Sequence, residues 1–302
     1  MYSVIDIGSN TIRLTVYHVL ENDEIQPIFH EKSVAGLAGY VTKDGRMSQE
    51  GIEKAAEVLN SFKEILRRLK LNHIHAFATA SLRNIVNTQE ALEKIRDLTG
   101  CSIQILSGKE EAVLDYVGAT YLVPINRGLV LDIGGGSTEL TFFNESGIEK
   151  ALSLPIGSLN LYNKFVTRVF PNEEEKKALE KAVLKELRKK AVPKTLCPLI
   201  CGVGGTIRAT GRLANDRLKL PVTNKKLLPD TVNEILWSFD GTSKDSLRQV
   251  LRIMPERLHT IIPGMVILDC VCRQFGAKEI HISDYGVREG YLISEILGKT
   301  EK

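Results

Sequence analysis

The chain has 302 residues, more than one hydrophobic core usually serves, so two domains are expected. Its 43% hydrophobic and 25% charged residues, without a low-complexity tract, exclude an intrinsically disordered protein. The formal net charge of +3, with basic and acidic residues interspersed, argues against a nucleic-acid-binding protein and is compatible with an anionic ligand.

The segments that decide location indicate a cytoplasmic protein. The N-terminus lacks a cationic segment followed by an apolar one, so no signal peptide is expected. The longest apolar run, from Met265, is broken by Asp269 and is far shorter than the ~20 residues of a membrane span. The five cysteines are an odd number, which fits reduced thiols, and Cys270 and Cys272 would not share a helix face as zinc ligands.

The first half of the chain is predicted to begin with two strands around a glycine turn, followed by a third strand. An amphipathic helix and a strand come next, and this strand ends in a strand-to-helix turn. A last strand and a helix from Lys109 close the half. The predicted segments are Tyr2–Ile7, Ile12–Val19, Ser48–Leu69, Ile74–Ala78, the turn Ala80–Arg83, and Ser102–Leu106.

The second half repeats this order. The sequence Asp-Ile-Gly-Ser-Asn-Thr at Asp6–Thr11 returns as Asp-Ile-Gly-Gly-Gly-Ser-Thr at Asp132–Thr138, an offset of 126 residues. Asn172 is predicted to cap the helix of this half. An insertion at about 212–278 is predicted to be mostly helical. The other predicted segments are Leu129–Ile133, Glu139–Phe143, the helix Asn172–Ala191, Leu196–Cys201, the turn Gly202–Arg208, Glu279–Ser283 and a helix from Val287.

The order βββαβαβα, found twice, predicts an α/β protein with mixed sheets flanked by helices. Loops from both halves are expected to face one interdomain cleft at the carboxyl ends of the strands. The pattern resembles the duplicated actin-like (ribonuclease H-like) fold of heat-shock chaperones, sugar kinases and some phosphatases. We expect domains at 1–123 and 124–287, with the C-terminal helix, about 288–302, packing on the first.

Both glycine turns are candidate phosphate-binding loops. Glycine lets backbone N–H groups approach a phosphate, and neighbouring hydroxyls add donors. A single such loop is as often only a tight hairpin, but two at equivalent positions favour phosphate binding. The expected contacts are Ser9, Asn10, Thr11, Gly134, Gly135, Gly136, Ser137 and Thr138.

Three carboxylates beside these turns are candidate metal ligands. Asp6, Asp132 and Glu139 suit Mg²⁺ or another divalent cation, which prefers a few carboxylates together with phosphate oxygens and water. The alternative is that Asp6 or Asp132 only binds its own turn, and that Glu139 lies on a solvated face.

A third loop and two charged residues complete the candidate site. The turn Gly202–Thr206 superficially matches a dinucleotide fingerprint, but no acidic residue follows in a clean βαβ unit. A third phosphate-facing loop, with contacts from Gly204, Gly205 and Thr206, is therefore favoured. Arg83 would bind phosphate oxygens, unless it forms an ordinary surface ion pair. Because Ser107 and Glu110 fit a capping box, Glu111 has no structural task and is a candidate general base.

Together these motifs resemble the exopolyphosphatase and guanosine pentaphosphate phosphohydrolase family in its short two-domain form. The resemblance runs nearly end to end and implies Mg²⁺-dependent hydrolysis of terminal phosphate from inorganic polyphosphate, or of the 5′ γ-phosphate of guanosine pentaphosphate. It also implies Glu111 as base and a possible homodimer. The matching segments are Val4–Thr11, Ala78–Arg83, Ser107–Ala112, Asp132–Leu140, Gly202–Thr206 and Ser283–Gly290.

Two departures and three alternatives remain open. Val113 stands where many relatives have Arg. Longer relatives add helical domains after the second half, whereas this sequence ends at Lys302, so the long-chain grip that those domains supply is not expected from it. A pentaphosphate phosphohydrolase, a sugar kinase of the same fold and a catalytically silent sensor are the alternatives. A lysine-rich helix would extend a polyphosphate track or simply be solvated. Its lysines are Lys176, Lys177, Lys181, Lys185, Lys189 and Lys190.

Overall fold

The computed structural model describes residues 1–21, 24–71, 73–121, 125–190, 196–239 and 244–299. Its contacts divide the chain into two compact units, Met1–Glu110 and Glu111–Lys302. The sequence-based boundary after residue 123 falls outside the described residues, so the division into domains 1–123 and 124–287 stays a prediction. Within the described ranges no helix is long and apolar enough to cross a membrane.

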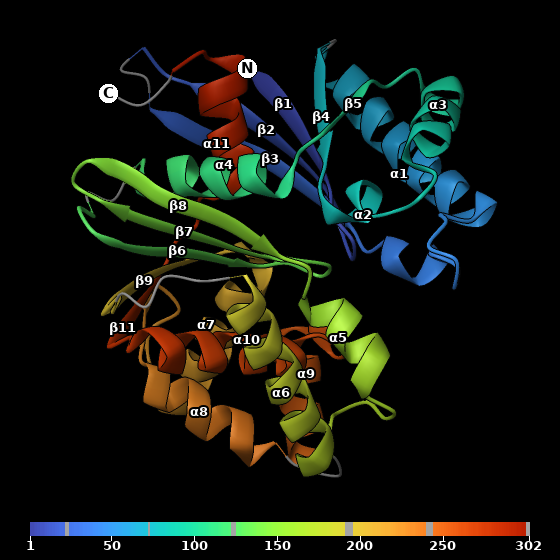
Figure 1. Ribbon diagram of the computed structural model, residues 1–302. Helices are drawn as coiled ribbons and strands as arrows, with labels where there is room; N and C mark the ends of the chain where they lie inside the picture. Colours follow the sequence, from blue (N-terminus) through green and yellow to red (C-terminus); the bar gives the residue numbers. More distant parts are fainter. Residues whose placement is uncertain (22–23, 72, 122–124, 191–195, 240–243, 300–302) are drawn as a thin grey trace. The chain divides into compact units, whose positions relative to one another are not determined.

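The first unit contains a five-stranded mixed sheet in the order β3-β2-β1-β4-β5 (Figure 1). β1, β2 and β3 pair antiparallel, whereas β4 and β5 continue the sheet in parallel. The predicted bounds of the first two strands and of β4 are confirmed. The strands are β1 (Tyr2–Ile7), β2 (Ile12–Val19), β3 (Ile25–Ser33), β4 (Ile74–Ala78) and β5 (Ile103–Ile105).

Helices cover this sheet through an apolar core. α1 starts where predicted, because the Ser48 hydroxyl accepts a hydrogen bond from the Gly51 amide at 3.2 Å. Its side chains Leu59 and Phe62 are buried against residues of the sheet and of α3. The helices of this unit are η1 (Leu37–Tyr40), α1 (Gln49–Arg68), α2 (Ala80–Arg83) and α3 (Thr88–Thr99).

The second unit repeats this strand order and adds one edge strand, giving β10-β11-β9-β6-β7-β8. β9 begins at Leu199 instead of the predicted Leu196. Pro198 has no amide N–H for a strand ladder, and its carbonyl accepts from the amides of Lys278 and Glu279 instead. The strands are β6 (Gly128–Ile133), β7 (Thr138–Asn144), β8 (Gly147–Leu154), β9 (Leu199–Val203), β10 (Lys226–Leu227) and β11 (Glu279–Ile282).

Helices lie on both faces of this second sheet (Figure 1). α4 packs on one face through Tyr116 and Ala119, and the almost wholly buried α10 packs on the other. The region 212–278 is mostly helical, as predicted. The helices are α4 (Gly108–Thr120), which begins at the end of the first unit, α5 (Ser158–Phe165), α6 (Glu173–Lys189), α7 (Gly204–Leu218), α8 (Pro229–Ser238), α9 (Lys244–Ile253), η2 (Pro255–Arg257), α10 (Ile261–Phe275), α11 (Val287–Tyr291) and η3 (Leu292–Ile296).

The lysine-rich helix α6 is capped by Asn172, as predicted, whose side chain accepts from the Glu175 amide at 2.8 Å. The prediction that Lys176 belongs to the solvated lysines is wrong, because its side chain is 2% exposed. Its ammonium group donates to the carbonyls of Leu236, at 3.0 Å, and Phe239 near the end of α8. The positive charge therefore caps the carbonyl end of a neighbouring helix.

α4 and the C-terminal helix α11 approach each other at glycines. A Cβ atom added to Gly118 would lie 2.1 Å from the carbonyl oxygen of Gly286. One added to Gly290 would lie 1.9 Å from the carbonyl oxygen of Leu114. Both positions require glycine, because in each case the obstacle is backbone.

One irregularity occurs in both sheets. The β2–β3 register shifts between Val16 and Tyr17, and the β7–β8 register shifts between Phe142 and Phe143, again 126 residues further on. A shift of this kind is a β-bulge, which bends the strand and increases its twist.

Candidate active site

The two glycine turns have the same internal geometry, each within its own unit. The amide of Gly8 donates to the carbonyl of Thr11 at 3.1 Å, and the amide of Gly134 donates to the carbonyl of Ser137 at 3.0 Å. Both turns close a hairpin, β1–β2 in the first unit and β6–β7 in the second. The repeated motif therefore folds twice into one turn conformation.

In both turns the backbone carbonyls are held by the unit's own chain. In the first unit the carbonyls of Ser9 and Asn10 accept from the amides of Ala38, at 3.0 Å, and Gly36, at 2.9 Å. In the second unit the carbonyl oxygens of residues 134–136 accept hydrogen bonds from the start of α5. Their donors are the amides of Ser158, Leu159 and Asn160 and the side-chain amide of Asn160.

The backbone amide N–H groups within the two glycine turns remain available to bind an anion. Among the residues that the structure describes, no hydrogen bond uses the amides of Ser9, Asn10, Gly135 or Gly136. Successive amides with no internal acceptor form the concave donor surface that binds anions. Anchored carbonyls and available amides are the arrangement that phosphate oxygens need.

The charged residues that flank the turns differ between the units. Asp132 stands opposite Glu139 in the β6–β7 ladder, whereas Asp6 stands opposite Arg13 in the β1–β2 ladder. Facing residues on one side of a sheet lie close enough to interact. The second unit thus pairs two acidic residues where the first pairs an acid with a base.

The third loop places a helix N-terminus against Asp132. α7 begins at Gly204, which has a φ of +77°, and a Cβ added there would lie 1.9 Å from the Asp132 Oδ1 atom. Glycine is required for both reasons. The N-terminal end of a helix favours negative charge, so α7 stabilises an ionised carboxylate or a phosphate there.

The hydroxyls of Ser137 and Thr138 are buried in the second turn, and the side chain of Thr206 is buried as well. It is 1% exposed, and its hydroxyl accepts from an Arg257 guanidinium nitrogen at 3.4 Å. Its methyl group lies against Gly264 of α10. A phosphate contact from this residue would therefore come from its backbone amide.

Glu111 directly follows Glu110, which belongs to the capping box at the start of α4. The Ser107 amide donates to the Glu110 carboxylate at 2.6 Å, and the Glu110 amide donates to the Ser107 hydroxyl at 3.2 Å. This confirms the predicted capping box and assigns Glu110 to it. Glu111 is 6% exposed, within the second unit.

Glu111 belongs to a group of four acidic side chains in the second unit. Burial raises the pKa of Glu139 well above its usual range, and the negative charges of Glu111 and Asp132 raise it further. The hydroxyls of Ser153, at 2.8 Å, and Ser137 act in the opposite direction. Glu139 therefore binds a proton easily unless a positive charge is supplied.

Asp115 is the fourth member of this group and was missed by the sequence analysis. It is 1% exposed, and burial raises its pKa, as do the charges of Asp132, Glu111 and Glu139 in that order; the amide of Val287 lowers it. Asp115 follows Glu111 by four residues on α4, a spacing that puts both on one face of a helix. This four-residue spacing was the sequence signal that could have placed Asp115 beside Glu111.

The described carboxylates suit a cation only in part. Mutual repulsion among buried carboxylates favours a nearby divalent ion, whose charge would lower their pKa values. However, no three His, Cys, Asp or Glu side chains within the described ranges are arranged to hold one ion. Mg²⁺ commonly takes only one or two carboxylates, with phosphate oxygens and water completing its shell. Asp132 and Glu139 fit that donor set.

Arg83 is fixed at the end of the first sheet. Its guanidinium donates to the carbonyl of Leu106 at 2.9 Å, after β5, and the side chain is half-buried. This bond positions a guanidinium group, which carries five N–H donors in a planar fork of the kind that suits phosphate oxygens.

Gly157 and Asn160 were also missed as parts of the second turn. A Cβ added to Gly157 would lie 2.4 to 2.5 Å from backbone atoms of Gly135 and Gly136. The side-chain amide of Asn160 donates to the carbonyl of Gly136 at 2.9 Å, and its oxygen accepts from the Gly157 amide at 2.8 Å. The glycine was the only sequence signal for this contact.

Known proteins resemble this chain over almost its whole length. The sequence model of the Ppx/GppA phosphatase family matches residues 15–299 of the chain. The chain belongs to this family. A solved structure of the Aquifex aeolicus Ppx/GppA family member is 28% identical, covers 100% of this chain and 99% of that one, and superposes with a TM-score of 0.79. The two units therefore have the predicted actin-like fold.

Two curated relatives carry phosphatase names. Exopolyphosphatase 1 of Mycobacterium tuberculosis is 24% identical over 97% of this chain and 87% of that protein. The bifunctional 3-dehydroquinate synthase/phosphatase of Fusobacterium nucleatum is 29% identical over 98% of this chain. This chain spans 46% of the Fusobacterium protein, so the comparison concerns one part of it.

Proposed function

We propose that this member of the Ppx/GppA phosphatase family is an exopolyphosphatase that releases orthophosphate from the end of inorganic polyphosphate. The strongest support is the pair of equivalent turns whose carbonyls are anchored and whose amides at residues 9, 10, 135 and 136 are available to anions. Relatives named exopolyphosphatase add to this support.

In the proposed reaction the turn amides and the hydroxyls of Ser9 and Thr11 bind non-bridging phosphate oxygens, and Arg83 donates to others, whereas the Thr138 hydroxyl already donates to the Ile156 carbonyl at 2.7 Å. The Glu111 carboxylate accepts a proton from a water molecule as the water oxygen attacks the terminal phosphorus. The bond from this phosphorus to the bridging oxygen breaks, and the shortened chain keeps the bridging oxygen with its electron pair. Gly204, Gly205 and the Thr206 amide form the third phosphate-facing loop.

We assign Asp132 and Glu139 to a bound Mg²⁺ or similar divalent cation, and the part predicted for Asp6 in that site stays a prediction. Such an ion would neutralise phosphate oxygen charge and relieve repulsion among the buried carboxylates. Chelation by EDTA should therefore abolish phosphate release, and added Mg²⁺ should restore it.

The decisive test is phosphate release from polyphosphate by the wild type, Glu111→Gln and Glu110→Gln. Glu111→Gln keeps the side-chain shape but removes the base, so kcat should fall about 10²- to 10⁴-fold. Glu110→Gln is the matched control. Because Glu110 only caps α4, this substitution should leave kcat nearly unchanged. Equal kcat values in all three proteins would remove Glu111 from the mechanism.

Guanosine pentaphosphate is the second substrate to include. Phosphate contacts recognise charge and not the base, so the turns alone do not separate the two substrates. A wild-type kcat/KM that is higher for guanosine pentaphosphate than for every polyphosphate length would replace our assignment. Binding of either compound without release of phosphate would indicate the sensor.

A further inference from the structure

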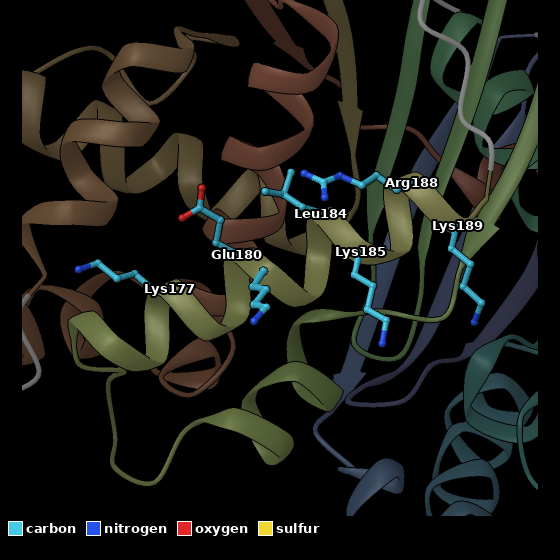
Figure 2. Close-up of a pocket in the computed structure, with 7 residues that line it drawn as sticks. Lys177, Glu180, Leu184, Lys185, Arg188 and Lys189 are labelled. Carbon is cyan, nitrogen blue, oxygen red and sulfur yellow. The ribbon is translucent and has the colours of Figure 1, made fainter.

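The solvent-exposed face of α6 carries a row of basic side chains (Figure 2). These residues border an open depression of about 650 Å³. A second depression of about 450 Å³ lies between α5 and α6 and shares Lys181 and Lys185 with the first. Its other side includes Lys164 of α5. The basic row consists of Lys177, Lys181, Lys185, Arg188 and Lys189.

Most of this charge is not neutralised by the protein itself. Among the described residues, Lys177, Lys181 and Lys185 form no salt bridge with a carboxylate. The acidic residue among them, Glu180, is paired at 2.7 Å with Arg273 of α10. Surface lysines elsewhere do pair along their helices, as Lys94 does with Glu90 in α3.

Helix stability does not explain the row. Lys177, Lys181, Lys185 and Lys189 follow one another at intervals of four residues, where like charges destabilise a helix. The helix dipole favours cations only in the last turn, which holds Arg188 and Lys189. The first three lysines therefore repel one another along the helix, and within the described part of the chain none of them forms an ion pair that offsets this repulsion.

We propose that the basic row binds the remote phosphates of a polyphosphate chain whose end is hydrolysed at the active site. Residues four apart on a helix advance ~6 Å along its axis and turn ~40° around it, so the four lysines make a row ~18 Å long that winds gradually around α6. A regular linear polyanion can contact all of them at once, whereas a single phosphate group contacts one or two. The inference rests on the proposed function and names how that substrate is held.

The chemistry of the row favours polyphosphate over nucleic acid. Proteins that bind single-stranded nucleic acid combine basic grooves with aromatic side chains on which bases stack. The lining residues of the two depressions include one aromatic ring, Phe165, which is half-buried and lies 5.3 Å from the Lys164 ammonium. The row itself carries no aromatic side chain, so its charges recognise phosphates and not bases.

The test compares a row variant, Lys177→Gln/Lys181→Gln/Lys185→Gln, with a control that removes the same charge elsewhere. The control is Lys219→Gln/Lys244→Gln/Lys278→Gln, three exposed lysines of the second unit outside α6. Values of kcat/KM are measured for tripolyphosphate and for long-chain polyphosphate at low and high salt. Thermal unfolding shows that each variant is folded.

The row variant should lose about tenfold in kcat/KM for long polyphosphate through a higher KM, since exposed charge contacts each contribute modestly. Its activity on tripolyphosphate should not change. High salt should reduce the difference from the wild type, because screening weakens exposed charge contacts. The control should resemble the wild type with both substrates.

Several results would overturn the inference. Equal losses for short and long substrates, or an equal loss in the control, would show that the row is not a chain-binding surface. Displacement of long polyphosphate from Glu111→Gln by single-stranded RNA at equal phosphate concentration would assign the row to nucleic acid. A wild type that cleaves no polyphosphate of any length, including tripolyphosphate, would instead refute the proposed function.

Discussion

Replacing Gly118 by alanine should destabilise the second unit, although alanine by itself favours a helix. The helical preference is about 1 kcal/mol in favour of alanine. Against it, the new Cβ would lie 2.1 Å from the Gly286 carbonyl oxygen and 2.8 Å from its carbonyl carbon. Both are backbone atoms, which no side-chain rotation can move, so α4 and α11 must separate.

The expected loss follows from these opposing effects. Overpacking costs about 1–3 kcal/mol, and a backbone obstacle places this substitution near the upper end. Subtracting the helical gain leaves about 2 kcal/mol of lost unfolding free energy. For a unit of this size, that corresponds to a Tm lower by about 4–8 °C.

Calorimetry of Gly118→Ala and of Gly39→Ala would measure this loss. Gly39 has no atom within 4 Å of an added Cβ and no positive φ, so its alanine variant should keep the wild-type Tm. Because α4 carries Glu111, the kcat of Gly118→Ala should fall as well. An unchanged or raised Tm for Gly118→Ala would refute the close approach of the two helices.

Two predictions concern protonation. Asp115 keeps its proton to higher pH when folded than when unfolded, so it lowers stability progressively as pH rises above about 4. In EDTA the Tm of Asp115→Asn should therefore exceed that of the wild type by a margin that grows from pH 4.5 to 8; a constant margin would contradict this. Burial raises the pKa of Cys201, Cys270 and Cys272 to about 12, so a thiol reagent at pH 8 should label them only after unfolding. Unfolded thiols ionise near pH 8.5, so stability should also decline as pH rises above that value.

Local sequence rules predicted the elements whose causes are local. The capping box at Ser107 and Glu110, and the cap at Asn172, depend on residues three apart, and both are confirmed. The hairpin strands follow from apolar runs around glycine turns. These features require no knowledge of what packs against them.

The features that the sequence analysis missed depend on neighbours distant in the chain. Lys176 lies in a run of charged residues, and only the carbonyls of Leu236 and Phe239 explain its burial. Likewise, Asp115 is an ordinary polar residue of a helix until Asp132 and Glu139 are brought beside it. Tertiary packing decides both cases: the spacing of Glu111 and Asp115 places them on one helix face, but it does not tell which residues that face meets.

The matching register shifts after Val16 and Phe142 bear on how this protein arose. Alternating hydrophobicity would be satisfied without a bulge, so nothing in the general requirements of a sheet selects the same site twice. An irregularity shared at one offset is evidence of descent: both sheets derive from a single ancestral gene segment that was copied and fused. The opposed pairs Asp6–Arg13 and Asp132–Glu139 then show that the copies diverged in charge while inheriting their shape.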